Sequence, residues 1–441
     1  MSRSEHFIST FRNVLQQVVL SLSLGCLVII AAIQSAQAQT FFVLHTFTGG
    51  ADGGVPLAGM IIDPAGNLYG TTIKGGTGSC SYSGAPGCGT IFELKKHSSS
   101  WVFNPLYSFQ GGADGEASVR PLTRGPNGTY YGTTLGGGEG VCDFEEVPGC
   151  GVVFNAGPTA QPPRTPLLQF RENVLYRFTD GTDGGGPYST VTFDPSGNIY
   201  GTTIGGGANN HGAVFELSPR GGGTYTETAV YSFCPQYPCP DGAGPYDGLI
   251  VDAIGNLYGT TTSGGSNNYG TVFELSPSGS GWTEHVVYSF QGGSDGDAPY
   301  GSVAMDSAGN LYGNTGYGGS GGGGTVYQLT PNGSSWNFNL LYTVPHGGNA
   351  LGRVTLDSSG NLYQTLQTGG AFGYGQVLEL MHSGSNWTYV DLYDFTNGSD
   401  GGYPSGGVVI DSNGNLYGTA DHGAASGCGG EGCGVAWEIM R

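Results

Sequence analysis

Two short acidic segments carry the side chains best suited to hold a metal ion. The segments "DGTDGG" (180–185) and "SDGDAP" (294–299) each place two carboxylates close together along the chain. Calcium favours oxygen ligands of this kind. The predicted calcium ligands are Asp180, Asp183, Asp295 and Asp297. Neither segment matches a full EF-hand loop, and Asp-Gly is first of all a turn former, so a simple turn is the alternative.

Asp-Gly also recurs outside these segments, and tyrosines lie at the start of several apolar segments. The further aspartates are Asp52, Asp114, Asp241 and Asp400, and the tyrosines are Tyr188, Tyr246, Tyr300 and Tyr403. Aromatic rings beside carboxylates suit a sugar, which presents apolar C–H faces and a rim of hydroxyl groups. We take these eight residues as candidates for a ligand-binding face. Packing of the rings and turn formation by the aspartates are the alternatives.

No catalytic signature stands out in the sequence. The histidines occupy no common position in the repeats described below, and no G-x-S-x-G, H-E-x-x-H or P-loop segment occurs. An acid and base pair could be any two carboxylates, and nothing singles out one pair. No cofactor other than calcium is indicated. The chain has 13 Lys and Arg and a net charge of −20, which argues against nucleic acid and against an anionic membrane surface.

The start of the chain is typical of an export signal. Residues 1–38 contain an apolar run over 18–33 and a small-x-small cleavage site, "AQA", at 36–38. We expect a secreted, extracellular or periplasmic protein whose single domain covers 39–441. A lipoprotein anchored at Cys26 and an uncleaved membrane anchor are the alternatives. No other apolar run is long enough to span a bilayer.

Eight further cysteines form four close pairs in the sequence. The pairs are Cys80 with Cys88, Cys142 with Cys150, Cys234 with Cys239, and Cys428 with Cys433. An even number of cysteines in local pairs after a signal peptide predicts disulfides formed in an oxidising compartment. A zinc site is disfavoured, because no C-x-x-C occurs and His422 is the one histidine near any pair.

Three sequence motifs each occur seven times and define the elements that position these residues. They are exemplified by "GNLYGTT" (66–72), "GTIFEL" (89–94) and "VVYSF" (286–290). A fourth apolar segment, such as "YGSVAMD" (300–306), precedes each copy of the first motif. These short segments are rich in Val, Ile, Tyr and Phe and are bounded by Gly, Asp and Asn, which is the signature of strands joined by tight turns. Each repeat therefore predicts four antiparallel strands.

Seven four-stranded units without a helical pattern predict an all-β fold, a seven-bladed β-propeller. A solenoid and a string of small sandwiches are the alternatives. The last repeat ends after its third strand, whereas "FFVLHTF" (41–47) is a fourth strand without a repeat of its own. A ring joins the two, so we expect the N-terminal strand to complete the last blade. His45 then takes the place of the tyrosine in "VLYSF" as a packing variant.

The same strand assignment predicts which face of the ring binds ligands. The connections between the second and third strands, and between successive blades, share one face and are the longer and more varied ones. All four cysteine pairs fall on this face, either to hold Gly-rich loops in place or to preorganise a binding surface. The glycine of "LYG" is expected to let the next blade approach closely.

The unit "D-x-x-GNLYGTT…GG…GTVFEL…VLYSF…DG…P" resembles the GloVer (Gloeobacter/Verrucomicrobia-type) tandem repeat over residues 41–439. That repeat occurs in exported bacterial proteins with varied C-terminal anchors, and the resemblance implies an extracellular protein without an established activity. The chain ends at "WEIMR" without such an anchor, so release from the cell is the expectation. "PYGSVAMDSAGNLYG" is more distantly similar to strand pairs of NHL and streptogramin-lyase propellers.

Taken together, the sequence predicts a glycine-rich, non-catalytic binding or scaffold protein. Its expected partner is a carbohydrate or a surface protein, and the protein itself is expected to be a monomer without a membrane span after signal cleavage. A polysaccharide-acting lyase or hydrolase and a purely structural surface protein are the alternatives. An enzyme would show charged residues that break the sevenfold regularity near the ring axis.

Overall fold

The computed structural model describes residues 39–441 except 83–84, 99, 139, 145–146, 159–169, 280, 385 and 425–426. Phe41–Ile439 form one compact unit. The expected signal peptide over 1–38 lies outside the described residues, so it stays a prediction. In the described part of the chain, no helix has the length and apolar character needed to cross a membrane.

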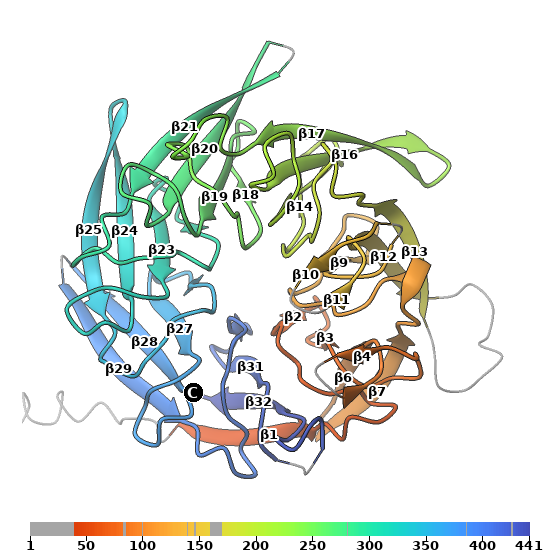
Figure 1. Ribbon diagram of the computed structural model, residues 1–441. Helices are drawn as coiled ribbons and strands as arrows, with labels where there is room; N and C mark the ends of the chain where they lie inside the picture. Colours follow the sequence, from red (N-terminus) through yellow and green to blue (C-terminus); the bar gives the residue numbers. More distant parts are fainter. Residues whose placement is uncertain are drawn as a thin grey trace, which may run out of the picture. The chain divides into compact units, whose positions relative to one another are not determined.

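The compact unit consists of seven antiparallel four-stranded sheets, which Figure 1 shows as blades arranged in sequence order around a ring. From the inner to the outer strand, blade 1 consists of β2 (Met60–Ile62), β3 (Leu68–Thr72), β6 (Thr90–His97) and β7 (Ser100–Ser108). Blade 2 consists of β8 (Thr123–Arg124), β9 (Tyr130–Thr134), β12 (Val152–Pro158) and β13 (Phe170–Arg177). Blade 3 consists of β14 (Thr192–Phe193), β15 (Ile199–Thr203), β16 (Ala213–Gly221) and β17 (Thr224–Ser232).

Blades 4 to 6 repeat this order, and blade 7 takes its outer strand from the start of the chain. Their strands are β18 (Ile250–Val251), β19 (Leu257–Thr261), β20 (Thr271–Ser278) and β21 (Gly281–Ser289); β22 (Ala304–Met305), β23 (Leu311–Thr315), β24 (Thr325–Asn332) and β25 (Ser335–Thr343); β26 (Thr355–Leu356), β27 (Leu362–Leu366), β28 (Gln376–Ser383) and β29 (Asn386–Asp394); and β30 (Val409–Ile410), β31 (Leu416–Ala420), β32 (Val435–Met440) and β1 (Thr40–Thr46). The predicted seven-bladed β-propeller is confirmed.

Strand β1 closes the ring as the sequence predicted. It pairs with β32, and the N–H of Phe47 donates to the carbonyl of Gly434 at 3.1 Å. The ring of Phe41 stacks on Tyr393 of blade 6, with ring centroids 3.8 Å apart. Phe47 is fully buried. The closing strand therefore combines a sheet ladder with aromatic packing against the preceding blade.

The turn between the first two strands explains the recurrent "D-x-x-G-N-x-Y". Oδ1 of Asp63 accepts from the N–H groups of Ala65 and Asn67, and Oδ2 accepts from the Asn67 amide and the Tyr69 hydroxyl. Blades 3 to 7 repeat these bonds at Asp194, Asp252, Asp306, Asp357 and Asp411. One carboxylate thus satisfies the turn and orients the tyrosine, as an Asx-turn does.

The glycine of "LYG" has a different role from the expected one. A Cβ on Gly70 would lie 2.5 Å from Cζ of Phe92, which is its cross-strand partner on β6 of the same blade. The glycine therefore makes room for an aromatic ring within its own sheet and not for the next blade. Blade 6 supports this reading, because Gln364 replaces the glycine and its partner is the smaller Leu378.

Successive blades are joined by the first threonine of "GTT". Its hydroxyl donates to a backbone carbonyl at the start of the next blade, as from Thr202 to Asp247 at 2.9 Å and from Thr260 to Gly301 at 3.1 Å. The same bond runs from Thr71, Thr133 and Thr365. These bonds fix the segment that leads into each inner strand, and that segment forms the candidate site.

Candidate functional site

The four predicted disulfides are all present. They join Cys80 to Cys88, Cys142 to Cys150, Cys234 to Cys239 and Cys428 to Cys433. The first two close small hairpins, made by β4 (Ser81–Tyr82) with β5 (Ala85–Pro86) and by β10 (Asp143–Phe144) with β11 (Val147–Pro148). Phe144 of the second hairpin packs in one apolar cluster with Tyr188 and Tyr246. A stapled loop therefore supports the candidate ligand-binding residues.

A pocket of about 220 Å³ lies on the axis of the ring, because all seven blades contribute to its wall. Its lining residues are Leu57, Arg120, Tyr188, Tyr246, Tyr300, Tyr317, Leu351, Gln367 and Ser405. Six of them stand six residues before the turn residue of their blade, so one repeat position supplies most of the wall. We call this cavity the axial pocket.

Three of the four tyrosines predicted for the ligand face come together in the axial pocket. The rings of Tyr188 and Tyr246 have centroids 4.4 Å apart, and those of Tyr246 and Tyr300 lie 5.1 Å apart at 81°. Tyr317, which the sequence did not single out, continues the row at 6.1 Å from Tyr300. The pocket therefore presents aromatic surface from three adjacent blades.

Arg120 adds a cation to this aromatic wall. Its guanidinium carbon lies 4.7 Å from the ring centre of Tyr188 and 5.6 Å from that of Tyr246, within cation–π range. One Nη donates to the carbonyl of Tyr246 at 2.9 Å. Its Nε lies 3.8 Å from Oδ1 of Asp247, which is buried. The arginine is thus held in place by blades 3 and 4 while it lines the pocket.

A polar chain continues the wall on the side of blades 6 and 7. The amide of Gln367 donates to the hydroxyl of Ser405 at 2.9 Å, and that hydroxyl donates to Oδ2 of Asp421 at 3.0 Å. Burial raises the pKa of Asp421 to about 8 in spite of this hydrogen bond. Oδ1 of Asp421 makes no hydrogen bond within the described residues. At neutral pH this carboxyl is largely protonated, so it fixes Ser405 without adding a full negative charge.

Tyr403 lies apart from the other predicted tyrosines. It stands eight residues before its turn aspartate, and Ser405 occupies the place that the tyrosines have in blades 3 to 5. Its ring contacts Tyr374 and His422, and it lines a separate, open pocket of about 840 Å³ with Glu431. In blade 7 the tyrosine precedes the proline, whereas in blades 3 to 5 it follows the proline, and this order places Tyr403 outside the axial pocket.

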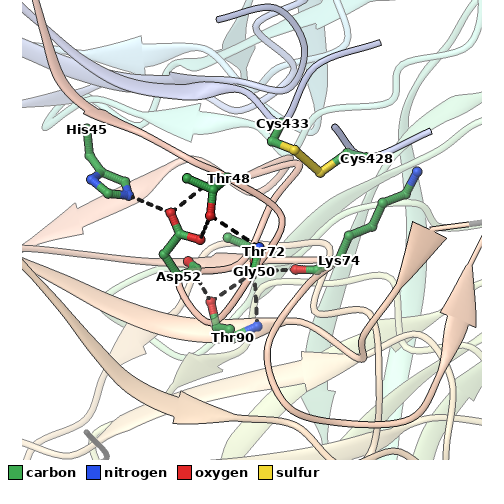
Figure 2. Close-up of polar contacts among 9 residues, drawn as sticks. All are labelled: His45, Thr48, Gly50, Asp52, Thr72, Lys74, Thr90, Cys428 and Cys433. Atoms are coloured by element: carbon green, nitrogen blue, oxygen red, sulfur yellow. Dashed lines mark hydrogen bonds and ion pairs between the residues drawn. A yellow bond between two sulfur atoms is a disulfide. The ribbon is translucent and has the colours of Figure 1, made fainter. Parts of the chain in front are cut away.

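The aspartates of the Asp-Gly pairs have partners within their own loops. Each accepts from the tyrosine near the end of the preceding outer strand, and the pairs are Tyr107–Asp114, Tyr176–Asp183, Tyr231–Asp241, Tyr288–Asp295 and Tyr393–Asp400. In the first loop His45 takes the place of the tyrosine, with Nε2 3.1 Å from Asp52, and Thr48 also donates to Asp52 (Figure 2). These contacts match the turn-forming alternative.

The residues predicted to bind calcium differ in their surroundings. Asp180 and Asp183 are electrostatically coupled, since burial and the charge of Asp183 raise the pKa of Asp180. Burial also raises the pKa of Asp297, and a hydrogen bond from the N–H of Ala298 lowers it in part. In the described part of the chain two groups could hold an ion by geometry, and both contain disulfide cysteines, which are poor ligands: His211 with Cys234 and Cys239, and Cys80, Cys88 and Glu116. Calcium binding stays a prediction.

Charged residues near the axis were not identified from the sequence. Arg120 and Asp247 stand five residues before their turn residues, where the other blades have Gly, Ala or Ser, and Arg353 stands four before. Aligning the repeats on the turn residue would have shown them as departures from the pattern. No local feature of the sequence shows that residues of blades 2, 4 and 6 lie near one another.

The fold and the axial pocket define a seven-bladed β-propeller with a small, aromatic and charged cavity on its axis. Residues 140–347 match the family model of the Gloeobacter/Verrucomicrobia repeat, which confirms the predicted resemblance. No curated protein matches the chain.

Solved structures of other proteins share the fold. The extracellular domain of BT4673 from B. thetaiotaomicron, assigned as a one-component system, matches with a TM-score of 0.50 and 11% identity over 90% of this chain. The match spans 39% of that structure's chain. A PL25 ulvan lyase bound to the glycan GlcA(1-4)Rha3S matches with a TM-score of 0.51 and 11% identity, over 88% of this chain and 94% of the lyase. At such identities the likeness concerns the fold alone.

Proposed function

We propose that this protein is an exported β-propeller that binds carbohydrate in the axial pocket and acts as a binding or scaffold module. The observation that carries the proposal is the row formed by Tyr188, Tyr246 and Tyr300, three copies of one repeat position facing one cavity. Aromatic faces offer apolar surface to the C–H side of a sugar, and the polar tips meet its hydroxyl groups. Gln367 and Ser405 supply further hydrogen-bonding groups on the opposite wall.

The size of the pocket limits what can enter it. Its volume of about 220 Å³ is below the roughly 300–1,000 Å³ of sites that enclose a drug-sized ligand. One sugar residue, at a chain end or on a branch, fits this space better than a continuous polysaccharide segment. The rest of the glycan would then contact the loops that carry the disulfides.

Export is supported by the chemistry of the cysteines. Four local disulfides suit an oxidising compartment, and a reducing cytosol would open such bonds. BT4673, one of the structures with this fold, is described as an extracellular domain. We propose that residues 39–441 form the mature domain after removal of the signal peptide.

A polysaccharide-acting enzyme is the second candidate, favoured by one observation. Arg120, Asp247 and Arg353 interrupt the sevenfold pattern close to the axis, which is where an enzyme would gather its charged groups. A propeller of similar extent is a lyase with a bound glycan. Incubating the mature protein with polysaccharides and following new reducing ends and unsaturated sugars separates the two candidates. Sustained product formation would replace the binding proposal by the enzymatic one.

Binding is tested on a glycan array with the mature protein, with and without calcium, followed by calorimetry on the best hits. The variant Tyr300→Ala should weaken binding about tenfold to a hundredfold, which is the range for removing a central aromatic contact. Tyr389→Ala is the matched control, because Tyr389 lies on the outer strand β29, outside the axial pocket. Equal binding by both variants, or no glycan bound in either condition, would contradict the proposal. Dependence on calcium would support the predicted ion sites.

A further inference from the structure

Two arginines from different blades act electrostatically on one buried carboxylate near the ring axis, that of Asp247. Arg120 lies 3.8 Å from Asp247, and Arg353 of blade 6 is close enough to both to be attracted by Asp247 and repelled by Arg120. Both carboxylate oxygens of Asp247 also accept from backbone N–H groups, those of Gly248 in the same blade and Ser302 in the next. The cluster therefore carries an excess of positive charge.

The neighbouring blades leave room for Arg353. A Cβ on Gly407 of blade 7 would lie 2.8 Å from Cγ of Arg353, and a Cβ on Gly301 of blade 5 would lie 3.0 Å from its Cα. Gly407 thus makes room for the stem of the arginine side chain, and Gly301 makes room for its backbone. In the described part of the chain Arg353 makes no hydrogen bond and no ion pair with direct contact. Its half-buried guanidinium therefore remains available to a ligand.

The surroundings of Arg353 disfavour its charged form when no ligand is bound. Burial lowers the pKa of Arg353, attraction to Asp247 opposes this effect, and repulsion by Arg120 adds to it. A partly buried cation without a full partner is destabilising unless another group compensates it. In a chain with 13 basic and 33 acidic residues, two unbalanced arginines at one place are a specific departure.

We propose that the sugar residue bound in the axial pocket is anionic, and that its carboxylate or sulfate is held by Arg120 and Arg353. Guanidinium groups bind both anions through paired N–H donors, whereas the tyrosines hold the sugar ring. The proposal rests on carbohydrate binding at this pocket and adds the charge of the ligand. Arg120 forms part of the pocket wall, and Arg353, which is not one of the lining residues, is the second cation and is close enough to interact electrostatically with Arg120.

Matched ligand pairs test the charge directly. Oligogalacturonates are compared by calorimetry with the same oligomers after reduction of their carboxyl groups, and a sulfated oligosaccharide is compared with its desulfated form. We expect the charged member of one pair to bind at least about tenfold more tightly, as for a hydrogen bond to a charged group. The pair that shows the difference identifies the anion. Equal affinity within both pairs, with binding present, would overturn this inference and leave carbohydrate binding intact.

Variants of Arg353 give an independent reading. Arg353→Gln should lower the affinity for the charged oligomer about tenfold or more while affinity for the uncharged oligomer stays the same. Arg353→Lys should retain part of the difference in affinity between the charged and the uncharged oligomer. Arg220→Gln is the matched control, because it removes the same charge from the outer hairpin of blade 3 and should leave both affinities unchanged. Without ligand, Arg353→Gln should melt at about the same temperature as the parent protein, because no hydrogen bond or ion pair of Arg353 is lost in the described part of the chain. A lower melting temperature with unchanged discrimination would show that Arg353 is structural and would overturn the proposal.

Discussion

A glycine on the second strand of a blade is paired with an aromatic residue on the third strand, and where one changes the other changes too. Gly313 on β23 faces Tyr327 on β24, and a Cβ on the glycine would overlap with the tyrosine ring. In blade 6 the corresponding pair is Gln364 and Leu378. The Gln364 amide reaches the carbonyls of Gly352 and Thr365, so the larger side chain is accommodated once the ring is absent. Repeats can therefore differ in sequence while they conserve volume.

This compensation predicts a coupled pair of substitutions in blade 5. Gly313→Gln alone should destabilise the protein by about 1–3 kcal/mol through overpacking. Tyr327→Leu alone should cost roughly 2–4 kcal/mol, because it leaves a cavity. The double variant should cost less than the sum of both, since it reproduces the blade 6 pair. Urea unfolding measures the three values, and strict additivity would contradict the explanation.

At the scale of elements, β1 is the piece of the structure whose position in the chain is unusual. It supplies the outer strand of blade 7, and its residues Phe41 and Phe47 pack against blades 6 and 1. Without it β32 would expose a strand edge, and the ring would lose the link between its first and last blades. We therefore expect the strand to stabilise the ring through its place in the sheet and not through its order in the sequence.

Moving this strand to the other end of the chain tests whether its place in the sheet or its order in the sequence stabilises the protein. Deleting residues 41–47 should lower the melting temperature of the whole protein and increase aggregation. A permuted chain that carries the same segment after residue 441, joined by a flexible linker, should recover most of the lost stability because the ladder with β32 can form again. Differential scanning calorimetry compares the three proteins. A deletion variant that melts like the parent would contradict closure by β1.

At the scale of the whole molecule, carboxyl groups with raised pKa values are distributed around the ring. Burial raises the pKa of Glu172 to about 8 and the pKa values of Glu227 and Glu284 to about 7. In each case the charge of an Asp-Gly aspartate adds to the effect of burial; the aspartates are Asp114, Asp183 and Asp241. These glutamates lie on the outer strands β13, β17 and β21, so the effect recurs at three successive blades.

The raised values predict that stability falls as the pH rises. The unfolded chain has glutamate pKa values of about 4.3, so the folded state binds more protons between that value and about 8. The stability from these groups is fully present below about pH 4 and is lost as the pH rises through 7 to 8. We expect the melting temperature to decrease from pH 5 to pH 9. Glu172→Gln, Glu227→Gln and Glu284→Gln combined should flatten this dependence.

High salt is the control for this measurement. It screens the repulsion that follows from the net charge of −20 but has less effect on partly buried groups. The decrease with pH should therefore persist in high salt for the parent protein. A melting temperature that is constant or rises between pH 5 and pH 9 would contradict the assignment of these glutamates.

The sequence alone determined the repeat, the four strands of each blade, the closing strand and the disulfide pairs. These features follow from patterns within one repeat, because strand alternation, tight turns and local cysteine pairs depend on residues close in the chain. The tertiary structure alone decided which side chains meet on the axis. Arg120, Asp247 and Arg353 are separated by more than a hundred residues at each step, and ring closure brings them together. Tyr403 was moved away by a two-residue shift, because distance from the turn sets a side chain's place around the axis.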